Sequence, residues 1–408
     1  MPHIIESGFR PLGSRRILLM PLDSTLFRNP RILLVPGSDG YAAYHTDTGR
    51  IHRLNASAAL ILELFDGTRT MREVCADLQP ILGPSGISAA KRWIDYAVSE
   101  GFLSSVSQPS KSLRPLSASA ATKRAQRLRD EGQILAAYAC QHHVSTLTPE
   151  NPEVWKELGE LAHILGRRED ARQAYQRCLS LHPDAEISHI LLSLRDESPP
   201  PRAPDECIRQ IYSRFADYYE ENMCDELHYQ APSLLAVAVR EAISTRDSLE
   251  VLDLGCGTGL IAEHLRPLAR RLTGIDLSPE MVDRARQSEF YDLLEVAEIT
   301  DWLSWDSKPA FDLIVACDTL IYFGDLSQVV VPAANCLGPG GTLAFTVEKG
   351  SHNEPFRLTD SGRYTHTIDH ITAVAEDARL GLDRICTEVL RYEYSEPVEG
   401  LLVVLSRS

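Results

Sequence analysis

Apolar positions in the N-terminal part of the chain change from short runs to a helical spacing. The short runs, each bounded by Pro, Gly or Asp-Thr-Gly, predict three β-strands: Arg31–Val35, Gly40–Thr46 and Ile51–Leu54. The helical spacing predicts three helices: Ala56–Phe65 behind an Asn55 cap, one starting at Thr70 with Glu73 in a capping box, and Ser88–Glu100. Three short strands followed by three helices predict a winged-helix-like α+β domain.

Residues 120–196 contain an internal repeat. Four residue types recur 34 residues further along the chain. The first copy has Gly132, Ala137, Leu147 and Pro149, and the second has Gly166, Ala171, Leu181 and Pro183. A period of 34 residues is that of tetratricopeptide repeats, so we predict a short α-helical segment of this kind, with half of a third unit at Asp184–Leu194. So few repeats are near the lower limit for a free solenoid, and we therefore expect the segment to pack on a neighbouring domain. A spacer and a partner-binding groove both remain open as its role.

Two stretches rich in Pro, Ser and Ala divide the chain. They are Ser104–Thr122 and Ser198–Pro204. Proline lacks an amide donor and fixes φ, so it interrupts helices and central strands. We interpret both stretches as linkers between three segments.

Beyond the second linker, strands alternate with helices. The predicted strands are Leu249–Leu254, Leu272–Ile275, Phe311–Ala316, Thr342–Val347, Ile385–Tyr394 and Gly400–Ser406, and a helix is expected to run through Leu268. This alternation predicts a Rossmann-like α/β domain with a mostly parallel sheet. Ligands of such sheets bind at the carboxyl ends of the strands.

Charge and cysteine usage narrow the classes of function. The formal net charge is −16, which argues against a general nucleic-acid or anionic-membrane binder. No apolar run is long enough to span a membrane. The nine cysteines are scattered, without C-x-x-C spacing, so we expect no metal site and a reduced, cytoplasmic setting.

A glycine-rich turn follows the first predicted strand of the α/β segment. Its pattern is D-x-G-x-G-x-G, built from Asp253, Gly255, Gly257 and Gly259. A dinucleotide-binding fingerprint, G-x-G-x-x-G, would need a glycine at the position of Leu260, so the turn does not match this fingerprint. Glycines allow the backbone to approach a ligand closely. An acid at the end of the next strand, Asp276, can accept both hydroxyls of a ribose.

The run VLDLGCGTG resembles motif I of the class I S-adenosylmethionine-dependent methyltransferases, and the likeness extends over residues 205–408. It implies S-adenosyl-L-methionine as the cofactor. Asp253 would face its cationic groups, and Asp318 with Thr319 would lie beside the sulfonium and the acceptor. The further cofactor-binding residues that the resemblance implies are Gly255, Cys256, Gly257, Gly259, Asp276, Leu277, Met281, Glu298, Ile299 and Tyr229. Phe215, Tyr218 and Tyr229 resemble lid residues over the cofactor.

Within that superfamily the chain looks closest to predicted methyltransferases that carry tetratricopeptide repeats, through IYSRFADYYEENM and SGRYTHT. We expect the second stretch to be a polar loop over the sheet edge. The candidate catalytic residues are His366, Arg363, Tyr364 and Asp318. Methyl transfer depends mostly on positioning, and a base is needed only for a protonated acceptor. His366 or Asp318 could be that base, and Arg363 could anchor a substrate carboxylate.

The N-terminal stretches IHRLNASAALILELFDGTRTMREVCADL and WIDYAVSEGFL resemble the PqqD-like family, over residues 25–107. That resemblance implies capture of the leader of a ribosomally made precursor peptide as an added strand. The leader would lie against Ile51–Leu54 and the helix around Arg92–Tyr96, whose exposed face we expect to include Lys91 and Asp95. A plain winged-helix domain without a peptide is the alternative.

Together these observations favour a methyltransferase that modifies a ribosomally synthesised precursor peptide, with other maturation enzymes as further partners. Tethering the leader would raise the effective concentration of the core. A small-molecule methyltransferase, with the other segments serving assembly or regulation, remains open. A non-catalytic peptide chaperone or scaffold is the third reading. The sequence leaves open which atom is methylated.

Overall fold

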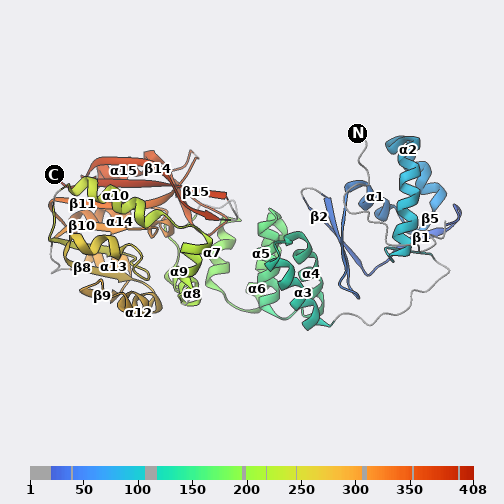
Figure 1. Cartoon of the computed structure of the whole chain (residues 1–408), viewed down its shortest axis with the longest axis horizontal. Coiled ribbons are helices and arrows are strands. Elements are labelled where there is room, and N and C mark those ends of the chain that lie inside the picture. The colour runs from blue at the N-terminus through green and yellow to red at the C-terminus, as the bar shows by residue number, and fades with distance from the viewer. Residues whose placement is uncertain are drawn as a thin grey trace. The chain divides into compact units, whose positions relative to one another are not determined.

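The protein is described from a computed structural model (Figure 1). The described residues are 20–37, 40–105, 117–194, 199–216, 218–244, 246–305, 310–351, 353–393 and 396–408. The chain divides into two compact units, Met1–His182 and Pro183–Ser408. Across the described ranges, no helix is both long enough and apolar enough to cross a bilayer.

The N-terminal unit begins with two small antiparallel sheets. One contains the predicted strands, in the order β2 (Ile32–Gly37), β3 (Gly40–His45) and β4 (Ile51–Leu54). The other has the order β5 (Asp66–Thr70), β1 (Thr25–Arg28) and β6 (Leu103–Ser105). The first sheet is confirmed as predicted. The second was missed because its strands are short and lack alternation of apolar and polar residues.

The predicted helices of this region are present. Helix α1 (Ala56–Leu64) begins at Asn55, whose side chain accepts from the Ala58 amide, and α2 (Met71–Ser99) begins with the Thr70 capping box. Helix α2 contains both remaining predicted helices, and they meet at a kink where Gly83 has a φ of 68°. Asp95 was expected on the exposed face of α2, but it is buried and accepts from the Met20 amide. The winged-helix assignment itself stays a prediction.

The repeat region folds into helix pairs. The helices are α3 (Ala118–Asp130), α4 (Ile134–Leu147), α5 (Pro152–Ile164) and α6 (Arg168–Leu181). Gly132 and Gly166 occupy the turns inside the two pairs, with φ values of 70° and 68°. The recurring glycine is therefore explained by turn geometry, whereas membership of the tetratricopeptide-repeat group stays a prediction. The first predicted linker ends too late, because Ser117 already caps α3. Residues 106–116 lie outside the described residues.

The helix pairs pack on the first sheet of the same unit, as expected. Tyr44 of β3 lies 5.8 Å from the His143 ring of α4, and Arg167 donates to the carbonyl of Pro36 at 2.9 Å. The predicted third half-repeat behaves differently. It forms α7 (Ala185–Ser193), which belongs to the C-terminal unit, and its His189 bonds the carbonyl of Gly362 at 3.0 Å.

A twisted, mostly parallel sheet forms the centre of the C-terminal unit. Its strands, in spatial order, are β9 (Leu293–Val296), β8 (Ala269–Asp276), β7 (Leu249–Leu254), β10 (Phe311–Ala316), β11 (Leu337–Lys349), β15 (Glu396–Ser406) and β14 (Gly381–Glu393). Strands β15 and β14 are antiparallel to their neighbours. Two short strands, β13 (Tyr364–His366) and β12 (Phe356–Leu358), extend from the end of β11. The Rossmann-like α/β prediction is confirmed.

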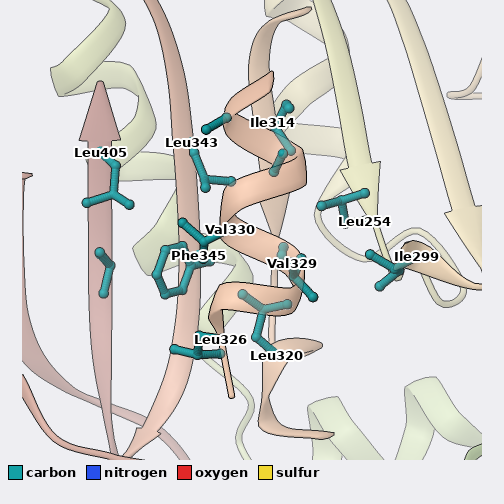
Figure 2. Packing of buried hydrophobic residues seen from close by; sticks show 14 of the residues in the cluster. Leu254, Ile299, Ile314, Leu320, Leu326, Val329, Val330, Leu343, Phe345 and Leu405 are labelled. Carbon is teal, nitrogen blue, oxygen red and sulfur yellow. The ribbon is translucent and has the colours of Figure 1, made fainter. Parts of the chain in front are cut away.

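Helices cover both faces of this sheet. They are α10 (Ala231–Ile243), α11 (Ala262–Leu265), α12 (Pro279–Gln287), α13 (Ile299–Ser304), α14 (Ser327–Cys336) and α15 (Ile368–Asp377). Apolar residues of α10 and α11 form one core cluster, and those of α13, α14 and α15 form another. Figure 2 shows Val330 of α14 beside Phe345 of β11, within the cluster that also contains Val329 and Leu343. Because both faces of the sheet are buried, the sequences of its central strands are nearly continuous apolar runs.

The second predicted linker is wrong as a free connection. Pro201 accepts from the amides of Gly324 and Asp325, and the Ala203 amide donates to Tyr322. Arg202 forms a β-bridge with Phe323. The proline-rich sequence excludes helix and central strand but permits an extended segment at the edge of a domain. Residues 199–204 are therefore part of the C-terminal unit, and α8 (Asp205–Phe215) and α9 (Tyr219–Glu221) follow them.

Candidate functional site

A cavity of about 650 Å³, open mouth included, lies at the carboxyl ends of β7, β8 and β10. Ligand sites of open α/β sheets occur at this edge. The cavity brings together most of the residues predicted to bind the cofactor: Gly255, Gly257, Asp276, Leu277, Met281, Glu298, Ile299 and Asp318. Four other predicted residues do not line it: Asp253, Cys256, Gly259 and Tyr229.

The glycine turn leaves its backbone open to the cavity. Gly255 and Gly257 have φ values of 70° and 53°, in the left-handed region that favours glycine. A Cβ on Gly255 would lie 2.3 Å from the Thr319 side chain. At Gly257 nothing lies within 4 Å of a Cβ, so a side chain there would take space that a ligand could use. The turn is suited to a ligand that lies directly on its backbone.

Asp276 ends β8 with its carboxylate at the cavity. Its two oxygens accept from the amides of Gly257, at 2.9 Å, and Ser278, at 2.8 Å. Burial raises the pKa of this carboxyl, and the backbone amides oppose the rise. Each oxygen keeps a second lone pair for a ligand hydroxyl, so the site fits a ribose diol.

The next part of the wall is apolar with one acid at its edge. Leu277, Met281 and Ile299 supply the apolar surface. Glu298 caps α13 and forms an ion pair with Arg202 at 2.6 Å. Burial raises the pKa of Glu298, but bonds from Thr300 and backbone amides outweigh it and hold the pKa below its ordinary value. A flat base fits between such apolar side chains with its polar edge toward the acid.

Asp253 does not face the cavity as predicted. It is fully buried, because β7 is buried on both faces, and it accepts from the Tyr291 hydroxyl at 2.7 Å. Burial raises its pKa to about 7, with the nearby Asp276 charge adding to the shift. Tyr229, predicted as a lid residue, places its hydroxyl 3.5 Å from the Cys317 sulfur instead.

Asp318 lines the cavity and also ends a buried ionic cluster. Its backbone has a φ of 55°, and its side chain is 8% exposed. One carboxylate oxygen pairs with Arg391 at 2.8 Å, and the other has no hydrogen-bond partner among the described residues. Arg391 also pairs with Glu348 and Glu393. We define the ionic cluster as Asp318, Glu348, Arg363, Arg391 and Glu393.

The expected catalytic loop is a strand, which corrects three predictions. Tyr364 and His366 lie in β13 between β11 and β12, and both are fully buried. The Tyr364 hydroxyl donates to the carbonyl of Pro200, and the His366 ring stacks on His370. Arg363 pairs with two acids of the ionic cluster, so its guanidinium is not free for a substrate carboxylate. None of the three lines the cavity.

Sequence reasoning missed several cavity residues, among them Arg202, Tyr212 and Tyr219. The stretch IYSRFADYYEENM contains both Tyr212 and Tyr219, but the prediction took Phe215 and Tyr218 from it. Those two side chains are 36% and 49% exposed, outside the cavity.

Comparisons with known proteins agree with this geometry. Residues 252–345 match the family model described as "Methyltransferase domain". The C-terminal unit contains a methyltransferase domain. Residues 40–83 match the model described as "Coenzyme PQQ synthesis protein D (PqqD)". The predicted methyltransferase and PqqD-like segments are thus confirmed over these ranges, whereas the wider boundaries stay predictions.

The curated relatives match part of this chain. Nodulation protein S of Rhizobium tropici is 36% identical over 97 residues, covering 23% of this chain and 41% of that protein. Ubiquinone biosynthesis O-methyltransferase of Xanthomonas euvesicatoria pv. vesicatoria is 33% identical over 109 residues, covering 25% and 46%. The chain spans about half the length of the curated relatives it matches.

Among solved structures, N-methyltransferase NodS from Bradyrhizobium japonicum WM9 in complex with S-adenosyl-L-homocysteine is 21% identical. The match covers 49% of this chain and 97% of that one, with a TM-score of 0.39. Magnesium protoporphyrin IX methyltransferase from Synechocystis PCC 6803 with bound S-adenosylmethionine is 16% identical, with coverages of 43% and 79% and a TM-score of 0.34. By their names, these two proteins bind S-adenosylhomocysteine and S-adenosylmethionine, respectively.

Proposed function

We propose that this chain is an S-adenosylmethionine-dependent methyltransferase that acts on a ribosomally synthesised precursor peptide. Residues 25–107 would capture the leader, and residues 205–408, with the preceding strap of residues 199–204, would methylate the core. The observation that supports this most strongly is the pairing of a PqqD match with a methyltransferase-domain match in one chain. Attachment through the leader would concentrate a weakly bound core at the cavity.

The cavity fits the cofactor residue by residue. Asp276 would hold the ribose, Leu277, Met281 and Ile299 the adenine faces, and Glu298 the adenine edge. When bound, S-adenosylmethionine supplies an activated methyl group. The protein's own contribution is to orient the acceptor and to exclude water, which is most of what methyl transfer requires. Half-buried Tyr212 and Tyr219 from α8 and α9 close the cavity over the sheet edge.

A free edge strand supports leader capture. Strand β4 has β3 on one side, and no described strand pairs with its other side. The His45 amide donates to the Arg50 carbonyl, and ladder bonds alternate from that pair. The backbone groups of Ile51 and Arg53 therefore point away from β3. They are the groups that an added peptide strand would bond.

Arg53→Pro removes one of these outward amides without breaking the β3 ladder. The probe is the product of a short reading frame beside the coding sequence. We expect Arg53→Pro to weaken binding of this peptide by about tenfold or more, and Arg53→Ala, which keeps the amide, to change it little. Both variants should retain cofactor affinity. Equal peptide binding by Arg53→Pro and the unsubstituted chain contradicts leader capture at this edge.

A small-molecule acceptor is the second candidate. Ubiquinone biosynthesis O-methyltransferase, by its name, serves the synthesis of a small molecule, and it is 33% identical over 25% of this chain. On this reading the N-terminal segments serve assembly or regulation. To test this candidate, turnover of a small acceptor is measured with the full chain and with a chain lacking residues 1–107. Equal turnover would favour the small-molecule function. Leader binding without any methyl transfer would instead favour a scaffold.

A further inference from the structure

Three tyrosine rings wall the cavity near Asp318. The Tyr212 ring lies 6.0 Å from both the Tyr219 ring and the Tyr322 ring, and the Tyr212 and Tyr322 hydroxyls are 2.9 Å apart. Burial raises the pKa of Tyr322 to about 12, with the Asp318 charge among the further causes, so the phenol is neutral. Burial and the Asp318 charge also raise the pKa values of Tyr212 and Tyr219. The three rings therefore offer uncharged π faces close to one carboxylate.

That carboxylate belongs to a cluster with an excess of negative charge. The ionic cluster contains three carboxylates, Asp318, Glu348 and Glu393, against the two guanidiniums of Arg363 and Arg391. One negative charge is left over. Asp318 is the member of the cluster that lines the cavity, and one of its buried carboxylate oxygens lacks a hydrogen-bond partner among the described residues.

The residues that line the cavity also carry an excess of negative charge. Four lining residues carry carboxylates, Asp205, Asp276, Glu298 and Asp318, and one, Arg202, carries a guanidinium. Arg202 pairs with Asp205 and Glu298. Asp276 serves the ribose. Asp318 is thus the acid available for a further ligand, and a buried carboxylate beside aromatic faces selects a cation.

We propose that the methyl acceptor is an amine, held as its ammonium between Asp318 and the rings of Tyr212, Tyr219 and Tyr322. This inference rests on the proposed methyltransferase function and narrows its acceptor class. A peptide N-terminus or a lysine side chain has this chemistry. Carboxylate and phosphate acceptors are disfavoured by the same charges.

Asp318 would also take the ammonium proton. Burial raises the pKa of this carboxyl, Glu348 and Glu393 add to the rise, and Arg391 and Arg363 oppose it. The transfer balances: one proton passes from the ammonium to Asp318, and the nitrogen lone pair forms the N–C bond. The C–S bond breaks with its electron pair left on sulfur, and the proton then leaves Asp318 for water.

The test uses the full chain and three probes of one shape: benzylamine, benzyl alcohol and benzoate. Each is titrated calorimetrically into protein saturated with S-adenosylhomocysteine. We expect benzylamine to bind about tenfold or more tightly than the other two, because it alone is cationic. Equal binding of the alcohol or benzoate, or no binding of benzylamine, overturns the amine assignment. Failure of S-adenosylhomocysteine to bind at all would instead overturn the proposed function.

Variants separate an acceptor site from a cofactor site. Asp318→Asn should weaken benzylamine about tenfold or more and change S-adenosylhomocysteine affinity less than about threefold. Glu220→Gln, an exposed acid on α9, is the matched control. Tyr219→Leu should weaken benzylamine, whereas Tyr219→Phe, which keeps the ring, should not. If Asp318→Asn weakens S-adenosylhomocysteine as much as benzylamine, Asp318 holds the cofactor's ammonium and the proposal is wrong.

Discussion

At the scale of single residues, Asp276 is the group on which the proposed cofactor site depends most. Asp276→Ala removes both carboxylate oxygens from the proposed ribose position, so we expect S-adenosylhomocysteine affinity to fall about tenfold or more. Calorimetry on the full chain measures this. Asp283→Ala is the control, because Asp283 is an exposed acid on the following helix, α12. Unchanged affinity of Asp276→Ala would place the ribose elsewhere.

The buried Asp253 carboxyl leads to a prediction about how the free energy of unfolding depends on pH. Burial raises its folded-state pKa to about 7 from an ordinary value of 3.8. Between these values the folded protein holds the proton more tightly than the unfolded chain, so this group's contribution to stability falls as pH rises through the window. Asp253→Asn removes that dependence and keeps an acceptor for Tyr291. The variant should therefore gain stability relative to the unsubstituted chain, by at most about 1.4 kcal/mol per pH unit, from about pH 4 to pH 7.

Denaturant unfolding of both proteins, without cofactor, across this range provides the measurement. A constant difference in unfolding free energy from pH 4 to pH 7 would show that Asp253 titrates near its ordinary pKa.

The sequence located the residues that we propose to hold the cofactor and, in the proposed acceptor site, Asp318, but it missed Tyr212 and Tyr219. Gly255, Gly257 and Asp276 were found because turn spacing and strand ends are local features. His366 was misassigned because SGRYTHT has loop-like composition, and its role as a short strand depends on pairing with β11. Arg363 forms ion pairs with Glu348 of β11 and Glu393 of β14. Both acids are distant from Arg363 in the sequence, so no local sequence pattern predicts these pairs.

At the scale of elements, the strap of residues 199–204 connects the two ends of the cavity. Arg202 orients Glu298, and Ala203 bonds the carbonyl of Tyr322. A fragment that begins at Asp205 lacks these contacts. We expect it to bind S-adenosylhomocysteine about tenfold more weakly than a fragment of residues 183–408. Equal affinity of the two fragments in calorimetry would show that the strap is only a connection.

Strand β14 contributes the most buried cation of the ionic cluster. Arg391 is 3% exposed and pairs with three carboxylates. Arg391→Met leaves them with Arg363 alone, so we expect a loss of about 3–5 kcal/mol in unfolding free energy. Arg384→Met is the matched control on the same strand, because Arg384 is 40% exposed and its partner Glu241 is 63% exposed. That change should cost about 1 kcal/mol or less. Similar losses for both variants would contradict a buried, coupled cluster.

At the scale of the whole molecule, apolar periodicity predicted the strands and helices of each unit well, because it reports burial. It did not predict which core a helix joins. Helix α7 continues the repeat in sequence, yet it packs on α8 in the C-terminal unit. Repeat similarity predicts that a helix forms, whereas its packing partner depends on residues distant in the sequence, such as Gly362, whose carbonyl bonds His189 of α7.

The central claim is that one chain recognises a leader and methylates the attached core. Mass spectrometry of the precursor peptide after incubation with the full chain and S-adenosylmethionine tests it most directly. The account predicts the mass gain of a methyl group on the core, little gain when the leader is removed, and little gain with Arg53→Pro at low peptide concentration. Equal methylation of leader-bearing and leaderless peptide, or methylation of neither, would contradict it.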